Sequence, residues 1–311
     1  MRKNENFSSF FEFILAVFTI FIKIYLRRRH VKEFCIVIPV YKTELDCIEQ
    51  ISLKRLNEVI GDKGYDVYLV CPHNLEITNF TNIYKDLKTK TYSPDYFRNT
   101  ATYSQLCVSY DFYNDFSDYR YMIIYQLDCY MFYDKLTEWC KGDFDYIGGP
   151  ILSTDCGWNT VKKNQNGAYH PYVGNGGFSL RKIETFKEIT DPNGEFRKRY
   201  EITDEILKNV RFEDKFFCND IYDYFKLYTP SWSEALYFAL DMSVDIVFIN
   251  MKWPGTPMCA HAVDKNIRYW KKVIPEFIDN KEVIDFCEKK HEDFFKLYYD
   301  ENDSTFRVAP K

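Results

Sequence analysis

The chain has 311 residues, 46% of them hydrophobic and 28% charged, which is the composition of a folded globular protein and excludes extensive disorder. Its formal net charge of −5 lacks the basic surplus of proteins that bind nucleic acid broadly, so we expect no nucleic-acid partner. The 10 cysteines include no Cys-x-x-Cys pair. We interpret them as reduced, structural thiols, which favours a cytosolic compartment.

The N-terminal segment is apolar from Phe10 to Leu26, continues into Arg27–Arg29, and includes the charged residues Glu12 and Lys23. The apolar run is shorter than the about 20 residues that a spanning helix needs, and on a helix its polar residues fall on one narrow stripe. We therefore interpret residues 1–30 as a membrane-associating helix that lies in the interface, with the following domain on the cytoplasmic side. A single-pass anchor and a helix packed on the protein itself are the alternatives.

Strand and helix patterns alternate at the start of the globular part, which we assign to residues 31–280. Residues 34–40 and 66–71 are short apolar runs typical of buried strands, and residues 45–56 between them have apolar side chains at helical spacing. A strand, a helix and a second strand in this order predict a βαβ unit with parallel strands. Residues 94–116 look helical, with Pro94 at a helix start.

The chain is organised around residues 119–134. Tyr121–Tyr125 is a run of apolar, β-branched and aromatic residues, which predicts a fully buried strand of a parallel or mixed sheet. The run ends at Gln126, Leu127 and Asp128, so one carboxylate lies at the carboxyl end of a central strand, where open α/β sheets bind their ligands. Asp128 has a plainer alternative interpretation, because aspartate often ends a strand as a turn residue.

Shorter elements follow. Residues 136–140 predict a short helix, and residues 145–150 predict a strand and a turn. Residues 151–172 are polar and irregular, and a loop of this length in a compact domain is usually functional or disordered. Within it we interpret Trp158 as a packing anchor, with stacking on a sugar or a base as the alternative. We assign residues 281–311 to a C-terminal helix and tail.

Three later features have both a functional and a structural interpretation. The glycine-rich segment at 173–181 allows close approach to a ligand, although a glycine turn is as often structural. Glu213 and Asp214 open a predicted helix that runs to about Phe225, where acids either complement the helix dipole or act as a general base. His261 is either a satisfied structural histidine or a metal ligand.

In their order along the chain, the strand that ends in aspartate, the glycine-rich strand, the Glu-Asp helix start and the late histidine resemble the core of GT-A glycosyltransferases. More specifically, the chain resembles an uncharacterised glycosyltransferase-like family that is catalogued as a domain of unknown function. The resemblance spans about residues 34–263. The matching segments are IPVYK (38–42), YQLD (125–128), WC (139–140), DYIGGP (145–150), VGNGGFSLRK (173–182), ED (213–214) and CAHA (259–262).

The resemblance implies an α/β fold, a single GT-A (Rossmann-like) domain with a mixed, mostly parallel central sheet flanked by helices. It also implies a hexosyltransferase-like enzyme that moves a sugar from a nucleotide-sugar donor to a glycan or glycoconjugate acceptor, as in polysaccharide biosynthesis. An inverting reaction assisted by Mn²⁺ or Mg²⁺ is part of this expectation. One departure is that Gln126 stands where the Asp-x-Asp motif has its first aspartate, so we expect weaker metal binding.

The resemblance also implies a role for each matching residue. Donor binding falls to Pro39, Val40, Tyr41, Gln126 and Asp128, and metal binding to Asp128 and His261. The donor–acceptor junction falls to Asn175, Gly176 and Gly177. Asp214 would accept the proton of the acceptor hydroxyl, with Glu213 beside it as the second catalytic acid.

Two other classes of function remain open. A catalytically inactive nucleotide- or glycan-binding scaffold is suggested by the missing first aspartate. A nucleotidyltransferase would need a glycine-rich basic loop after the first strand, and Pro39–Lys42 does not supply one.

Overall fold

The computed structural model describes residues 31–152, 172–221, 225–242, 244–292, 299–300 and 303–306. The predicted membrane-associating helix at residues 1–30 and the loop position of Trp158 lie outside these residues. Among the helices that the structure describes, none is long and apolar enough to cross a membrane. The nine cysteines in the described residues are free thiols, and eight of them are buried.

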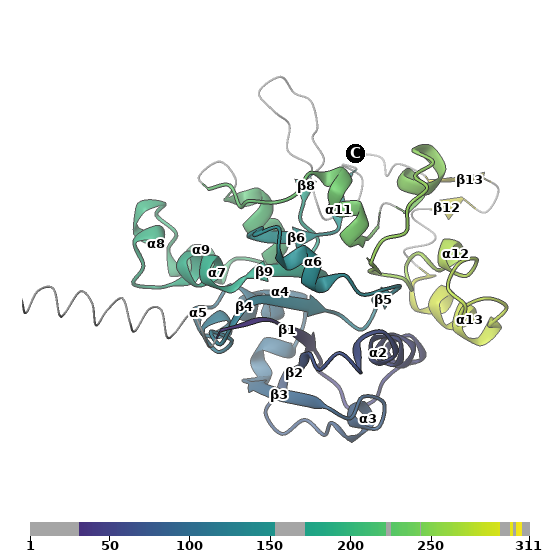
Figure 1. Cartoon of the computed structure of the whole chain (residues 1–311), viewed down its shortest axis with the longest axis horizontal. Helices are drawn as coiled ribbons and strands as arrows, with labels where there is room; N and C mark the ends of the chain where they lie inside the picture. The colour runs from purple at the N-terminus through teal and green to yellow at the C-terminus, as the bar shows by residue number, and fades with distance from the viewer. Residues whose placement is uncertain are drawn as a thin grey trace, which may run out of the picture.

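A six-stranded sheet forms the centre of the molecule, in the order β3-β2-β1-β4-β9-β6 (Figure 1). Its strands are β1 (Lys32–Pro39), β2 (Asp66–Pro72), β3 (Leu87–Tyr92), β4 (Tyr119–Tyr125), β6 (Tyr146–Gly148) and β9 (Phe178–Lys182). The pairs among β1, β2, β3 and β4 are parallel, whereas β9 runs antiparallel to both of its neighbours. The sheet is therefore mixed and mostly parallel, with helices around it, which confirms the predicted α/β class.

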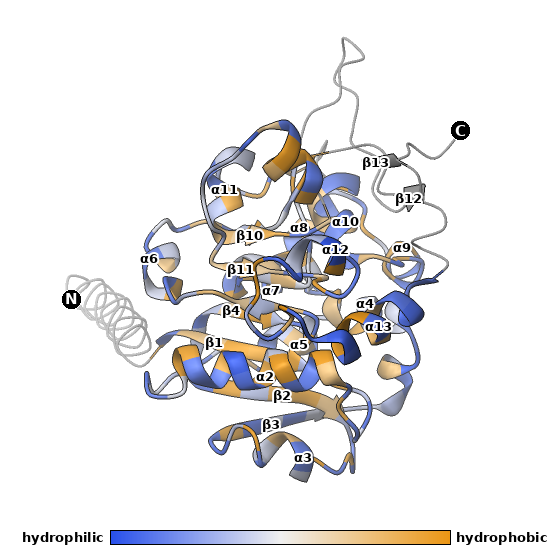
Figure 2. Ribbon diagram, turned by 90° about the vertical axis from the view of Figure 1, so that its right-hand side faces the viewer, coloured by the Kyte–Doolittle hydropathy of each residue, from blue (hydrophilic) through white to orange (hydrophobic). Residues whose placement is uncertain are grey.

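The first crossover helix, α2 (Cys47–Ile60), lies over strands β1 and β2 (Figure 2). It begins two residues later than predicted because Asp46 is its N-cap. The Asp46 side chain accepts from the backbone N–H of Glu49, whose own side chain accepts from the Asp46 N–H, and this capping box fixes the start of the helix. The short helix α3 (Thr78–Thr81) follows β2.

The prediction that residues 94–116 are helical, starting at Pro94, is confirmed, but the segment is divided into separate elements. The segment forms a 3₁₀ turn, η1 (Pro94–Phe97), and two short helices, α4 (Thr100–Cys107) and α5 (Tyr110–Asn114). The side chains of Asn99 and Ser109 each accept a hydrogen bond from a backbone N–H in the turn that follows. Because such caps satisfy the free donors of a helix start, each of them begins a new helix.

The helix predicted from Glu213 to about Phe225 is shorter than expected. It consists of α10 (Glu213–Lys215) and a π-helical turn, η2 (Phe216–Asp220). The first four residues of η2 are all buried. Consecutive buried residues do not fit one face of a regular α-helix, and the wider π turn accommodates them.

The other elements surround this sheet. The short helix predicted at 136–140 is confirmed as α6 (Leu136–Cys140), and β7 (Pro150–Ile151) pairs with β8 (Tyr172–Val173). The remaining helical elements are α7 (Ile183–Thr190), α8 (Glu195–Arg199), α9 (Asp204–Lys208), α11 (Trp232–Phe238), η3 (Ile246–Asn250), α12 (Ile267–Trp270) and α13 (Lys281–Lys290). A hairpin of β12 (Tyr299–Asp300) and β13 (Asp303–Phe306) follows.

A three-stranded sheet, in the order β10-β11-β5, positions the late histidine. Strand β11 (Cys259–Ala260) runs parallel to β10 (Ala239–Leu240) and antiparallel to β5 (Tyr130–Met131). Strand β5 begins shortly after Asp128, and β11 ends directly before His261. The pairing of β11 with β5 therefore brings these two side chains together from positions 133 residues apart.

Candidate functional site

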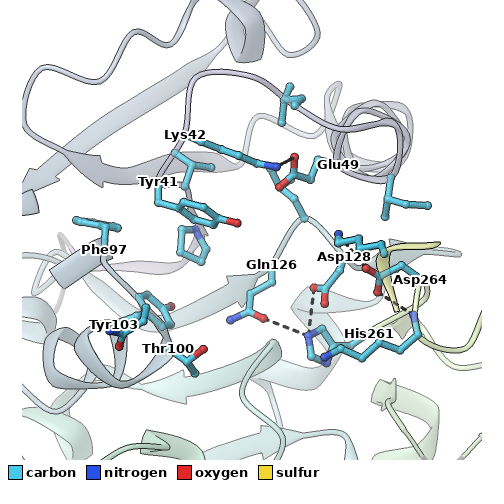
Figure 3. Close-up of a pocket in the computed structure, with 18 of the residues that line it drawn as sticks. Tyr41, Lys42, Glu49, Phe97, Thr100, Tyr103, Gln126, Asp128, His261 and Asp264 are labelled. Atoms are coloured by element: carbon cyan, nitrogen blue, oxygen red, sulfur yellow. Dashed lines mark hydrogen bonds and ion pairs between the residues drawn. The ribbon is translucent and has the colours of Figure 1, made fainter. Parts of the chain in front are cut away.

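A cavity of about 570 Å³ opens where strands β1 and β4 end (Figure 3). The last residue of β1 and the residues that follow it line one side of the cavity, and the residues that follow β4 line another. These are the predicted donor-binding residues Pro39, Val40, Tyr41, Gln126 and Asp128. Because β1 and β4 are parallel neighbours, their carboxyl ends lie at one edge of the sheet, where ligands of open α/β sheets bind.

Other segments form two further walls, and Leu45, Ile48, Glu49 and Phe80 also line the cavity. One comes from η1 and the start of α4, with Phe97, Arg98, Asn99, Thr100 and Tyr103. The other comes from the segment after β11 and from the end of α13, with His261, Asp264, Lys265, Lys290 and His291. Asp264 is buried and accepts from His291 Nε2 at 2.7 Å, while Lys290 Nζ lies 3.0 Å from the same carboxylate oxygen. The C-terminal helix α13 is thus tied to the cavity wall.

The turn after β4 holds Asp128 in place through its backbone. The Gln126 N–H donates to the Gly177 carbonyl at 2.9 Å, and the Val263 N–H donates to the Asp128 carbonyl at 3.1 Å. Between His261 and Val263, Ala262 has a left-handed φ of 52°. Such a backbone is costly for a residue with a Cβ and is often found at functional sites.

His261 and Asp128 form the polar centre of the cavity (Figure 3). His261 Nε2 lies 3.2 Å from Asp128 Oδ1 and 3.1 Å from Gln126 Oε1. Asp128 Oδ1 is buried and has no hydrogen-bond partner of good geometry, so its contact with His261 is an ion pair only. Burial would lower the pKa of His261, but the carboxylates of Asp128 and Asp241 outweigh it and raise this pKa well above its usual value.

The second ring nitrogen of His261 has a partner that sequence analysis missed. His261 Nδ1 lies 2.8 Å from Asp241 Oδ1, and Asp241 is buried. Asp241 directly follows β10, and the parallel register of Leu240 with Ala260 places it beside His261. Nothing in the sequence near Asp241 signals this role, because the two strands that create it have only two residues each.

The donor set at this centre fits a divalent cation. Asp128 offers a carboxylate oxygen without a full hydrogen bond, and His261 offers Nε2 on the same side. The Cys129 thiol is also close, since one ligand atom from each of Asp128, Cys129 and His261 lies within 4.8 Å of the others. Burial raises the pKa of this thiol well above its usual value, so the Asp128 carboxylate and the His261 imidazole are the better candidate ligands of the three. Carboxylate with imidazole suits Mn²⁺ better than the all-oxygen preference of Mg²⁺.

The glycine-rich loop before β9 lies between His261 and α10. A Cβ on Gly177 would lie 2.0 Å from His261 Nε2, and a Cβ on Gly176 would lie 2.9 Å from Glu213 Oε1. Asn175 Oδ1 accepts from the Gly177 N–H at 2.9 Å and closes the loop. The glycines therefore allow His261 and the acids of α10 to approach the loop from its two sides. Asn175, Gly176 and Gly177 do not line the cavity itself.

The two acids of α10 have different environments. Glu213 Oε1 forms a 2.8 Å ion pair with Arg181 Nη2, and its other oxygen accepts from Ser104 Oγ at 3.0 Å. The side chain of Arg181 is 0% exposed and that of Glu213 is 8% exposed. Glu213 therefore joins α10 to β9 and α4 as a structural ion pair, a role that sequence analysis did not anticipate.

Asp214 faces the glycine loop. Asp214 Oδ2 accepts from the Gly176 N–H at 3.0 Å, and Asp214 Oδ1 accepts from the Lys215 N–H at 2.7 Å. Burial and the negative charge of Glu213 raise the pKa of Asp214 to about 7. A carboxyl group with a pKa near neutrality can hold or release a proton under physiological conditions.

The family of this chain is shown by its sequence. The model of the family described as "Protein of unknown function (DUF5672)" matches residues 86–261, which is more than half of the chain. The chain therefore belongs to this family, in agreement with the resemblance found in its motifs. The matched segment ends at His261, so the cavity residues of α13 lie beyond it. A search of curated proteins finds no match.

Several solved structures are similar in architecture. One is the galactosyltransferase LgtC in complex with donor and acceptor sugar analogs, at 12% identity and a TM-score of 0.47, covering 73% of this chain and 86% of that one. Mouse xyloside xylosyltransferase 1 in its apo form has 9% identity and a TM-score of 0.48, covering 74% and 97%. The mannosyltransferase Ktr4p from S. cerevisiae has 13% identity and a TM-score of 0.40, covering 59% and 63%. Similarity at this level assigns neither a donor nor an acceptor.

Proposed function

We propose that this protein is a metal-assisted glycosyltransferase that moves a sugar from a nucleotide-sugar donor to a glycan or glycoconjugate acceptor. The observation that carries the proposal is the cavity at the carboxyl ends of β1 and β4, with the Asp128–His261 pair at its centre. A buried carboxylate oxygen without a full hydrogen bond, beside an imidazole nitrogen, is a costly arrangement unless a ligand completes it. A volume of about 570 Å³ lies within the range of small-molecule sites.

The cavity offers a place for each part of such a donor. Tyr41 is 62% exposed at the cavity rim and presents an aromatic surface to a nucleotide base. The walls include the cationic side chains of Lys42, Arg98, Lys265 and Lys290, which suit a diphosphate. Three of them also pair with carboxylates, Lys42 with Glu49, Arg98 with Asp95 and Lys290 with Asp264. Asp128 and His261 would hold Mn²⁺ or Mg²⁺, which when bound neutralises negative charge on a leaving diphosphate.

Asp214 is the proposed general base, and the ion pair of Glu213 with Arg181 anchors the helix that carries it. The Gly176–Gly177 loop, which we propose as the donor–acceptor junction, contacts Asp214 on one side and His261 on the other. Asp214 would accept the proton of the acceptor hydroxyl, since its pKa of about 7 lies near the optimum for a general base. A base of this kind, opposite the leaving group, would give inversion at the anomeric carbon.

The experiment is a thermal-shift screen of nucleotide sugars with and without Mn²⁺, followed by measurement of sugar release from each donor that binds. We expect at least one donor to raise the melting temperature only when Mn²⁺ is present. The variant Asp128→Ala should abolish this metal-dependent shift and the turnover while the protein stays folded. Asp115→Ala is the matched control, because Asp115 lies before β4 and accepts from the hydroxyl of Tyr92. Unchanged donor binding in Asp128→Ala would remove Asp128 from the site.

A second candidate function is a catalytically inactive nucleotide- or glycan-binding scaffold. The observation that favours it is Gln126, which contributes a neutral amide oxygen 3.1 Å from His261 Nε2 where the Asp-x-Asp motif has a carboxylate. The screen separates the two functions. A scaffold would show a donor-induced thermal shift without release of sugar, and an enzyme would show both.

A further inference from the structure

We infer that Asp241 is a positioning residue that fixes the ring of His261 so that Nε2 faces Asp128 and is available to a divalent cation. This inference rests on the proposed metal site and extends it by a residue that neither the motifs nor the cavity wall contains. Its basis is the 2.8 Å contact between His261 Nδ1 and Asp241 Oδ1.

The fold makes this contact specific. Strands β10 and β11 are parallel, Leu240 pairs with Ala260, and the His261 N–H donates to the Leu240 carbonyl at 2.9 Å. The next residues along the two strands, Asp241 and His261, are therefore held side by side. Gly149 leaves room for the Asp241 side chain, because a Cβ on Gly149 would lie 3.2 Å from Asp241 Cβ. The carboxylate thus has one defined approach to the imidazole.

The chemistry of histidine ligands explains what this contact does. With Asp241 accepting from Nδ1–H, the proton of a neutral imidazole is on Nδ1, and the lone pair is on Nε2. Nε2 is the atom that lies 3.2 Å from Asp128 Oδ1, so the lone pair points toward the carboxylate that would share the metal. A carboxylate behind a metal-binding histidine also raises its basicity, and loss of such a partner typically weakens metal binding about 10- to 100-fold.

A purely structural ion pair is the competing interpretation, since Asp241 is only 3% exposed and needs a partner in any case. The two interpretations differ in what a substitution changes. A structural pair contributes to the melting temperature alone. A positioning residue also changes the affinity for Mn²⁺, and a neutral oxygen acceptor at the same place recovers part of that affinity.

The test is a titration of the full-length protein with Mn²⁺ alone, in which electron paramagnetic resonance measures the free ion. Circular dichroism establishes that each variant is folded. We expect Asp241→Ala to weaken Mn²⁺ binding about 10- to 100-fold, and Asp241→Asn to lose less because its amide oxygen still accepts from Nδ1–H. The control is Asp66→Ala. Asp66 is also largely buried, but it pairs with Lys32 and Lys88 at the start of β2, at the opposite end of the parallel strands. This variant should bind Mn²⁺ as the wild type does.

Mn²⁺ affinity within twofold of wild type in Asp241→Ala, with loss of binding in His261→Ala, would overturn the inference, as would a wild type that binds no Mn²⁺. If Asp241→Ala does not fold, Asp241→Asn serves as the test variant. Loss of the charge should still weaken Mn²⁺ binding at least threefold, and unchanged affinity would overturn the inference. A wild type whose Mn²⁺ binding depends on His261 and Asp241, but which releases sugar from no donor, would refute the proposed transferase and leave this inference standing.

Discussion

At the scale of single residues, Gln126 is the side chain on which the strength of the proposed cation site should depend most. Its amide oxygen lies 3.1 Å from His261 Nε2 and next to the Asp128 carboxylate, so the cavity has one negative ligand where an Asp-x-Asp site has two. A hard dication gains more from an ionised oxygen than from an amide oxygen. In the proposed glycosyltransferase, a single charge would favour a cation held partly by the diphosphate of the donor.

The first prediction follows from this position. Gln126→Glu places a carboxylate where the amide now stands, with nearly the same shape. We expect Mn²⁺ to bind about 10- to 100-fold more tightly, since one interaction with an ionised group is worth about 1.5–3 kcal/mol and about 1.4 kcal/mol is a factor of ten. Calorimetry of Mn²⁺ with the wild type, Gln126→Glu and Gln126→Ala measures this difference. Equal affinity in Gln126→Glu and the wild type would mean that this side chain does not face the bound ion.

Asp214 has a property that can be tested without a substrate. Its pKa of about 7 in the folded protein lies above the value of about 3.9 for an unfolded chain. At a pH between these two pKa values, Asp214 has lost its proton in the unfolded chain but keeps it in the folded protein. The stability that this group contributes is therefore fully present below about pH 4 and is lost as the pH rises through 7.

For Asp214→Asn we accordingly expect a protein whose stability, relative to the wild type, increases between pH 5 and pH 8, as measured by urea midpoints at both values. Once a donor is known, the same variant should lose at least about a hundredfold in kcat with little change in donor affinity. Glu213→Gln should lose less in kcat. A pH-independent difference would contradict the raised pKa, and near wild-type turnover would remove Asp214 as the base.

At the scale of elements, α10 is held by charge as well as by packing. The ion pair of Glu213 and Arg181 is buried, and Arg181 Nη1 also donates to the hydroxyl of Tyr113 at 3.1 Å. This network links β9, α4, α5 and α10. It also packs against the glycine loop, where Glu213 and Arg181 lie beside Gly176. The position of Asp214 therefore depends on the buried pair of Glu213 and Arg181.

We expect Glu213→Ala to lower the free energy of unfolding by about 3–5 kcal/mol, because it leaves the guanidinium of Arg181 buried without a counter-charge. Glu33→Ala is the matched control, since Glu33 pairs with Arg120 at 3.2 Å on the surface, where such pairs are worth about 1 kcal/mol or less. Urea denaturation of both variants measures the difference. Similar small losses in the two variants would show that Arg181 finds another partner.

The elements also show what the sequence could predict. The strands around residues 34–40, 66–71 and 121–125 are found because continuous apolar runs have few alternatives to burial in a sheet. Strand β3, with the sequence LKTKTY, is missed because it is an edge strand with mostly exposed polar side chains. The breaks at Asn99 and Ser109 depend on local side-chain caps, which an apolar pattern does not reveal.

The site follows the same rule. Pro39, Val40, Tyr41, Gln126 and Asp128 follow apolar strands, and the edge of a parallel sheet gathers the residues that follow its strands. Asp241 cannot be predicted from the sequence, because its place beside His261 depends on β10 and β11, strands of two residues each. Glu213 and Asp214 look alike in sequence, and only tertiary contacts separate the buried ion pair of one from the raised pKa of the other.

At the scale of the whole molecule, the cavity lies where two hydrophobic clusters meet. The larger cluster covers the central sheet, and the smaller one includes α12, α13 and residues such as Ile48 and Tyr130. The end of α13 lines the cavity through Lys290 and also contacts the cap of α2, since Lys290 Nζ lies 3.3 Å from Asp46 Oδ2. A ligand in the cavity would thus touch the first and the last helices of the described domain.

The final prediction concerns the N-terminal segment. Both clusters consist of residues from 34 to 287, so deletion of residues 1–29 removes none of the described core. We therefore expect the truncated protein to fold, and to keep Mn²⁺ binding and any donor binding of the full-length chain. The deleted segment contains the apolar run from Phe10 to Leu26 and the basic residues Arg27–Arg29, which suit an anionic membrane surface.

Flotation with anionic liposomes tests the membrane part of this prediction. Full-length protein should rise with the vesicles, and the truncated form should remain in the dense fraction. Replacement of Arg27, Arg28 and Arg29 by glutamine is the control for charge, because about 1 kcal/mol of membrane attraction is expected for each basic residue. This variant should float less than the wild type, and salt should weaken flotation of the wild type. Equal flotation of the full-length and truncated proteins would assign membrane binding to the domain itself, and absence of flotation in both would refute membrane association.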